Sequence, residues 1–274
     1  MACRTDYAHI RQLSVAGRNA YVVRTNERRM WRSCSFTKTI VLAMNTFYRA
    51  TFALLFTLAF VAPSAAQSFG LGADIVSRYI WRGTDFGESA SIQPYLSFST
   101  GSVEIGSWAS YSVSADGANA SEHDLYVSIS LGSFSIGFTD YYFPAPNAAG
   151  FFNFDSDGEG AHWIEPNIGF EAPGSFPISL YAAMMVHNDP DNSLYLEANL
   201  PLSVEGVDAG ITAGMVAGES GFYGTEGAAL VNLGLSASKE IALSEDFSLP
   251  VSVAYIVNPA AERAFLVFGV NISL

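Results

Sequence analysis

Cations are scarce in most of this chain. Nine of its 13 Lys and Arg residues precede residue 67, whereas 24 of its 26 Asp and Glu residues follow that point. The part from Gln67 onward therefore carries four cations against 24 acids, a net charge of −20. Because nucleic-acid binding depends on clustered Lys and Arg, this balance argues against a nucleic-acid partner.

Cysteine is absent from the same part, since Cys3 and Cys34 both lie near the N-terminus. This excludes disulfides, thiolate metal sites and cysteine nucleophiles there. Its three histidines, His123, His162 and His187, show neither metal-ligand nor catalytic-triad spacing. We therefore expect no catalytic residue, no metal and no cofactor, and we predict that the protein is not an enzyme. A barrel-embedded lipid hydrolase that uses His162 is the weaker alternative.

A secretory signal peptide is predicted over residues 44–66. The segment has one cation, Arg49, then an apolar run over 50–61, and it ends in small residues. This three-part layout is typical of an export signal, and the apolar run is short for a membrane-spanning helix. We expect residues 1–43 to be a non-native extension that arises from an early start codon. A folded N-terminal domain and a transit peptide are the weaker alternatives. The mature chain is then 67–274.

From residue 67 onward, apolar residues recur with a period of two. The stretch LYVSISL (125–131) alternates apolar residues with Tyr or Ser, and FLVFGVNISL (265–274) behaves alike. About twelve such runs follow one another, most of them about nine to twelve residues long, the length of membrane-spanning strands rather than soluble ones. Short turns alternate with mostly longer loops. The pattern predicts an all-β fold, a transmembrane antiparallel up-and-down β-barrel of about 12 strands.

A soluble β-sandwich or a lipocalin-like barrel is the alternative fold. Its outward positions would carry many Lys and Glu residues, whereas the polar positions here are mainly Ser, Gly, Asn, Tyr and Thr. We therefore predict that the protein lies in the bacterial outer membrane. Its expected partners are the membrane lipid and the barrel-assembly machinery, which would act on the C-terminal strand.

The stretch SRYIWRG (77–83) holds two of the four cations of the mature chain. Continued alternation along the first strand places Tyr79 and Trp81 on the outer face, at the end nearest the first long loop. Aromatic residues of membrane barrels gather at such interfaces. The same alternation directs Arg78 and Arg82 into the lumen, the interior of the barrel.

The lumen is predicted to be acidic. The inward-facing charges are Asp74, Arg78, Arg82, Glu104, Asp124, Glu165, Glu171, Glu197 and Asp208. Because rings of carboxylates favour cations, one interpretation is a narrow, cation-preferring, porin-like channel for small solutes. The alternative is a non-conducting structural or adhesive barrel whose inward charges form salt bridges. The sequence identifies no solute.

Several motifs of the first half resemble one bacterial family. They are SRYIWRG, IQPYLSFSTGSVEIGSWASY and DLYVSISLGSFSIGFTDYYFP. The matching positions are Ser77, Tyr79, Arg82, Gly83, Ser107, Trp108, Ala109, Ser110, Asp124, Leu125, Tyr126, Tyr141, Tyr142 and Pro144. The chain resembles the uncharacterised outer-membrane family Gcw_chp, most closely over residues 68–144. The resemblance implies a signal peptide and a β-barrel, and it implies no established activity.

Overall fold

The computed structural model describes residues 12–15, 18–21, 67–114, 121–144, 150–156, 160–174, 177–245 and 247–273. The chain divides into two compact units, 1–63 and 64–274. In the first unit, β1 (Gln12–Val15) and β2 (Arg18–Tyr21) form a hairpin. The predicted signal peptide lies outside the described residues, as does most of the predicted extension.

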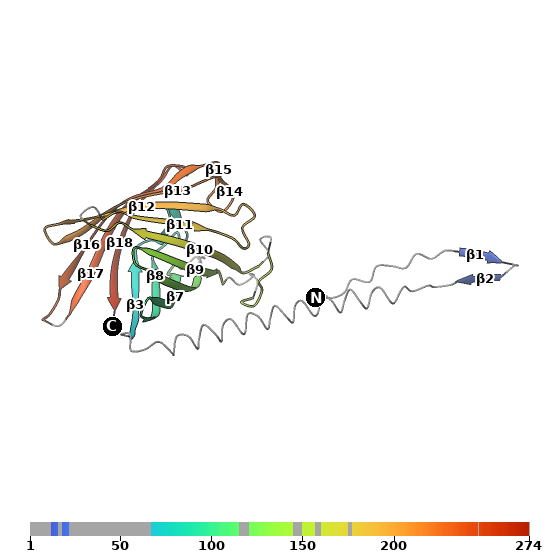
Figure 1. The fold of residues 1–274 in the computed structure, drawn as a ribbon, viewed down its shortest axis with the longest axis horizontal. Coiled ribbons are helices and arrows are strands. Elements are labelled where there is room, and N and C mark those ends of the chain that lie inside the picture. Colours follow the sequence, from blue (N-terminus) through green and yellow to red (C-terminus); the bar gives the residue numbers. More distant parts are fainter. Residues whose placement is uncertain are drawn as a thin grey trace. The chain divides into compact units, whose positions relative to one another are not determined.

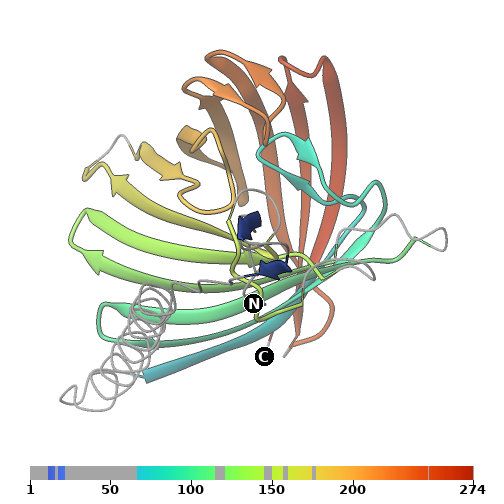
Figure 2. The ribbon, with the colours of Figure 1, turned by 90° about the vertical axis from the view of Figure 1, so that its right-hand side faces the viewer.

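Twelve antiparallel strands of the second unit form one closed barrel, as predicted (Figures 1 and 2). The strands are β3 (Gln67–Val76), β6 (Ser91–Thr100), β7 (Val103–Ser112), β8 (Glu122–Leu131), β9 (Phe134–Tyr142), β10 (His162–Glu171), β11 (Ser179–Met184), β12 (Leu194–Val204), β13 (Val207–Val216), β16 (Ala229–Ala242), β17 (Ser248–Asn258) and β18 (Arg263–Ser273). Each strand pairs with its neighbours in the chain, and β18 closes the barrel on β3.

The alternation seen in the sequence determines which side chains face outward. In β9, Phe134, Ile136 and Phe138 are exposed and point away from the barrel, while Ser135 and Gly137 point into it. Every barrel strand carries at least one large exposed apolar side chain of this kind. The outer face is thus apolar and the inner face is polar, the reverse of a soluble barrel.

The two ends of the barrel differ in their connections. Two-residue turns at 101–102, 132–133 and 205–206 lie at one end, which we call the short-turn end. The connections 77–90 and 217–228, which are much longer, lie at the other, which we call the long-loop end. Because the strand number is even, β3 begins and β18 ends at the short-turn end. In the part of the chain that the structure describes, no helix is long and apolar enough to cross a membrane; this finding has no bearing on a β-barrel.

Candidate functional site

The stretch SRYIWRG forms a small hairpin and does not extend the first barrel strand. Strand β3 ends at Val76, after which β4 (Ile80–Trp81) pairs with β5 (Thr84–Asp85). Arg82 and Gly83 form the two-residue turn, with φ values of 49° and 78°, as in a type I′ turn. A Cβ atom on Gly83 would lie 1.9 Å from the carbonyl oxygen of Val231 in the barrel wall. The tip of the hairpin therefore touches the wall from the inside, and only glycine fits there.

The turn holds Arg82 in the lumen against a carboxylate of the facing wall. Its guanidinium group donates two hydrogen bonds to Glu165, at 2.6 and 2.9 Å. It also donates to the hydroxyl oxygens of Tyr223, at 2.8 Å, and Tyr181, at 3.3 Å. The side chains of Arg82 and Glu165 are 9% and 1% exposed. This is a buried bidentate ion pair, the strongest geometry available to arginine.

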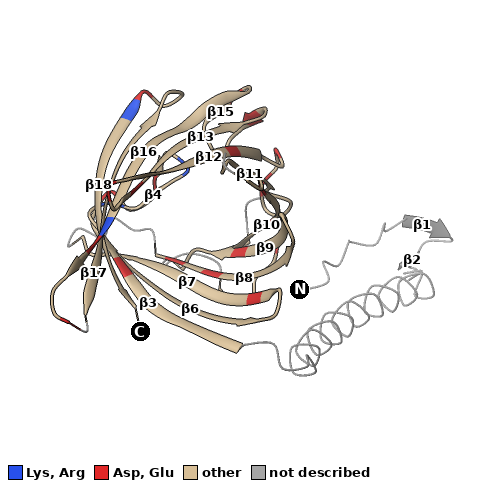
Figure 3. Ribbon diagram, turned by 60° about the vertical axis from the view of Figure 1, so that its left-hand side comes forward, with Lys and Arg blue, Asp and Glu red and all other residues tan. Residues whose placement is uncertain are grey.

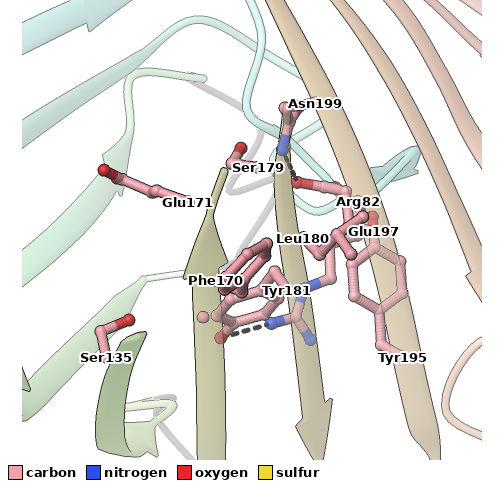
Figure 4. A pocket seen from close by; sticks show the side chains of 11 residues that line it. Arg82, Ser135, Phe170, Glu171, Ser179, Leu180, Tyr181, Tyr195, Glu197 and Asn199 are labelled. Atoms are coloured by element: carbon pink, nitrogen blue, oxygen red, sulfur yellow. Dashed lines mark hydrogen bonds between the residues drawn. The ribbon is translucent and has the colours of Figure 1, made fainter. Parts of the chain in front are cut away.

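Aromatic rings surround the same guanidinium group. Its central carbon lies 4.2 Å from the ring centre of Trp81, 4.3 Å from that of Tyr195 and 5.4 Å from that of Tyr181. Figure 4 shows Arg82 between the two tyrosine rings. Each ring attracts the cation through its negative face. Arg82 is thus held by charge, by hydrogen bonds and by stacking together.

A second hairpin supplies Tyr223. Strands β14 (Glu219–Ser220) and β15 (Thr225–Glu226) pair within the connection 217–228. The ring of Tyr223 stacks on Trp81 and on Tyr195, at centroid distances of 5.8 and 5.9 Å. Burial raises the pKa of Tyr223 to about 12, so the phenol is neutral at physiological pH. Both hairpins therefore fill the lumen near the long-loop end, and we call this assembly the plug.

Arg82 keeps its positive charge although its side chain is buried. Desolvation alone would lower the pKa of Arg82, but the hydrogen bonds and charge of Glu165 outweigh it and raise the pKa further above its ordinary value. The guanidinium is therefore a permanent cation inside the barrel.

A cavity of about 400 Å³ lies next to the plug, with Arg82, Tyr181 and Tyr195 in its wall. Its lining extends along β10, β11 and β12 to Glu171, which is exposed at the short-turn end. Glu197 also lines it and is bound by Asn199 at 2.9 Å, as Figure 4 shows. The cavity is thus polar and partly acidic, and Arg82 of the plug forms part of its wall.

The remaining predicted lumen acids lie on the inner faces of their strands. Asp74 accepts a hydrogen bond from Asn271 at 2.8 Å, and Glu104 accepts one from Ser99 at 2.9 Å. Asp208 is exposed near the short-turn end of β13. Acidic residues are spread over many strands, and Lys and Arg are few (Figure 3). The acids therefore line the lumen at different heights and do not form one ring.

The outward placement of Tyr79 and Trp81 was wrong. Tyr79 is buried and its hydroxyl donates to Glu122 at 2.9 Å, while Trp81 packs against Tyr223 in the plug. The alternation of apolar and polar residues predicts the direction of side chains only as far as Val76, where β3 ends. The rings of Tyr79 and Trp81 lie beyond that point and belong to the plug. Arg78 is 40% exposed and pairs with Asp85 at 2.6 Å within the hairpin, and its guanidinium group lies 6.0 Å from the ring centre of Phe265 on β18.

Sequence reasoning missed two contributors to the interior, Glu122 and Tyr223. Glu122 starts β8, two residues before Asp124 and on the same face. Extending the alternating stretch 125–131 back to the start of β8 would have revealed Glu122. Tyr223 had no such signal, because the chain separates it from Arg82 by 141 residues.

Both ring nitrogens of His162 have close partners. His162 Nδ1 lies 2.8 Å from Asp140 Oδ1, and Nε2 lies 2.6 Å from the carbonyl oxygen of Phe151. Neither ring nitrogen is left to activate a serine. Within the described ranges, no group of three or more His, Cys, Asp or Glu residues is arranged to hold a metal ion.

Fold and interior together define a class: a closed twelve-stranded β-barrel with a polar, plugged lumen and an apolar outer face. The chain belongs to the family Gcw_chp, described as bacterial protein of unknown function, whose model matches residues 61–271. The match extends well beyond the 68–144 stretch that carries the clearest motifs. No curated protein matches the chain.

Proposed function

We propose that this protein is an integral β-barrel of the bacterial outer membrane. The observation that carries the proposal is the apolar outer face, which is continuous around all twelve strands. Soluble monomers rarely expose apolar patches larger than a few hundred Å². Most of these strands have ten or eleven residues, close to the length that a tilted membrane strand requires. Membrane lipid is the partner that matches both features.

A matched pair of substitutions tests this proposal. Leu235 lies mid-strand on the outer face of β16 and is 58% exposed, while Leu243 lies in the 243–247 turn and is 59% exposed. In a membrane barrel, Leu235→Arg should cost about 2–4 kcal/mol of folding free energy, whereas Leu243→Arg should cost about 1 kcal/mol or less. Urea unfolding of protein folded into lipid vesicles measures both.

A soluble barrel predicts a different result, because water covers both leucines equally. Equal and small effects of the two substitutions, with folding in the absence of lipid or detergent, would refute the membrane location. The expected action of the assembly machinery on β18 belongs to the same proposal and would fail with it.

A closed, cation-preferring pore is a second candidate function. It is favoured by the cavity, which Glu171 and Glu197 line and whose wall includes Arg82 of the plug. Carboxylates along a pathway favour cations. The alternative is a structural barrel that conducts nothing.

Bilayer conductance in a salt gradient separates the two interpretations. A pore predicts channel events with a cation-selective reversal potential once the plug is weakened. If neither the natural protein nor a variant without Arg82 shows channel events, the structural barrel is the better account.

A further inference from the structure

Two buried carboxylates that do not belong to the Arg82–Glu165 ion pair lie together inside the barrel. Glu122 and Asp124 are two residues apart on the inner face of β8 and are 2% and 7% exposed. Asp124 is flanked in register by Trp108 on β7 and Tyr141 on β9. Side chains on the same strand face at this spacing are neighbours.

Their negative charge has no cationic partner among the described residues. Arg82 is engaged by Glu165, and Arg78 by Asp85. Lys239 and Arg263 lie on β16 and β18, strands that do not adjoin β8. A buried carboxylate without compensation is costly, so another species must balance these two.

One carboxylate oxygen is bare. Glu122 accepts the hydroxyl of Tyr79 at 2.9 Å, but Asp124 Oδ1 is buried and has no hydrogen-bond partner within the described ranges. Buried polar atoms in native proteins nearly always have a partner, and an orphan of this kind points to a bound ion or water.

Neutral oxygen ligands adjoin the pair. Ser110 lies directly opposite Glu122 in the register of β7 and β8, and its hydroxyl oxygen accepts a hydrogen bond from Gln93 Nε2 at 3.5 Å. The hydroxyl of Ser91, two residues from Gln93 on β6, is also buried without a partner in the described part of the chain. Carboxylate oxygens, completed by neutral oxygen atoms, are the ligands of hard cations.

We propose that Glu122 and Asp124 form a buried binding site for a hard divalent cation of the calcium class. Two carboxylates balance the charge of one such ion, and Ser110, which lies opposite Glu122, is the neighbouring residue with a neutral oxygen. A single proton shared by the two acids is the competing explanation. It would remove only one of the two negative charges. The cation would balance both charges and give Asp124 Oδ1 a partner, and it would do so whether or not the barrel lies in a membrane.

The first test is the thermal stability of chelator-treated, refolded barrel during titration with CaCl₂ at constant ionic strength. At roughly 100-fold excess over the dissociation constant, Ca²⁺ should raise the melting temperature by about 5–10 °C. Asp124→Asn should abolish this response and should raise the melting temperature in the absence of Ca²⁺. The control is Asp208→Asn, an exposed inner-face acid, which should leave the response intact.

Terbium luminescence keeps the proposal testable if Asp124→Asn fails to fold. Tb³⁺ occupies calcium sites, and Trp108, opposite Asp124, should sensitise its emission. Trp108→Phe, which keeps both carboxylates, should lower the sensitised emission several-fold, and excess Ca²⁺ should displace the signal. The proposal would be overturned if Ca²⁺ left the melting temperature unchanged. It would also be overturned if the rise in melting temperature with Ca²⁺ survived in both Asp124→Asn and Glu122→Gln. The first result would favour the shared proton, and the second would place the ion elsewhere.

Discussion

Replacing Arg82 with alanine is the most informative single change in this protein. It removes the two hydrogen bonds to Glu165, those to Tyr223 and Tyr181, and the cation between the aromatic rings. Glu165, with 1% of its side chain exposed, is left as a buried charge without its partner. The substitution therefore tests both the stability and the closure of the plug.

The expected loss is about 3–5 kcal/mol, the cost of breaking a buried ion pair by removing one member. For a barrel of about 200 residues, each kcal/mol lowers the melting temperature by roughly 2–4 °C, so the total shift is about 6–20 °C. Arg78→Ala is the matched control. Arg78 is 40% exposed in its pair with Asp85, so its loss should cost about 1 kcal/mol or less.

A double substitution separates the ion pair from simple filling of space. Arg82→Met with Glu165→Met removes both charges and keeps apolar volume, so most of the lost stability should return. The assay is the temperature at which the folded form, which migrates faster on a denaturing gel, is lost, measured in parallel with bilayer conductance. Arg82→Ala should also raise conductance if the lumen is a pore. An Arg82→Ala protein with the natural melting temperature would show that the plug is not held by this pair.

Two further predictions concern the hairpins of the plug. Gly83→Ala should lower the melting temperature well below that of Gly132→Ala: both glycines have positive φ, of 78° and 67°, but only Gly83 has a wall atom within 4 Å of the added carbon. Equal effects of the two changes would contradict the contact between the hairpin tip and the barrel wall. Alkaline unfolding should begin as the pH rises above about 10, because the unfolded tyrosine loses its proton there while Tyr223 in the folded protein holds it to about 12. The folded state binds more protons in that window, so stability falls with pH; Tyr223→Phe should flatten the decline between pH 10 and 12, and an unchanged slope would contradict the raised pKa.

The barrel could be predicted from the sequence because each strand repeats one simple rule. Over 125–131 in β8 and 134–138 in β9, apolar residues alternate with Tyr, Ser or Gly, and the outer and inner faces follow directly. The rule fails at 77–82, since a strand and a hairpin arm share the same period of two. Positive φ at Arg82 gives no sequence signal, because arginine rarely adopts it.

The contacts inside the barrel could not be predicted from one sequence for a different reason. Arg82 meets Glu165 from 83 residues away, and no local pattern specifies which of the many acids it selects. The sequence did offer salt bridges between inward charges as one interpretation, and Arg82 forms such a pair with Glu165. The sequence could not identify Glu122 and Asp124 as two acids that have no cationic partner among the described residues.

The plug also constrains the order in which the chain can fold. Its hairpin follows the first barrel strand, yet Glu165 lies in the sixth barrel strand. Asn258, which donates a hydrogen bond to the Gly83 carbonyl oxygen at 3.1 Å, ends the eleventh, 175 residues later. The partners of the hairpin within 77–90 are therefore absent until most of the chain has been synthesised. Contacts between residues so far apart in the sequence form late and slowly. Completion of the plug thus reports that the last strands have joined the first, so an unclosed barrel would retain an unpaired arginine and a loose aromatic hairpin.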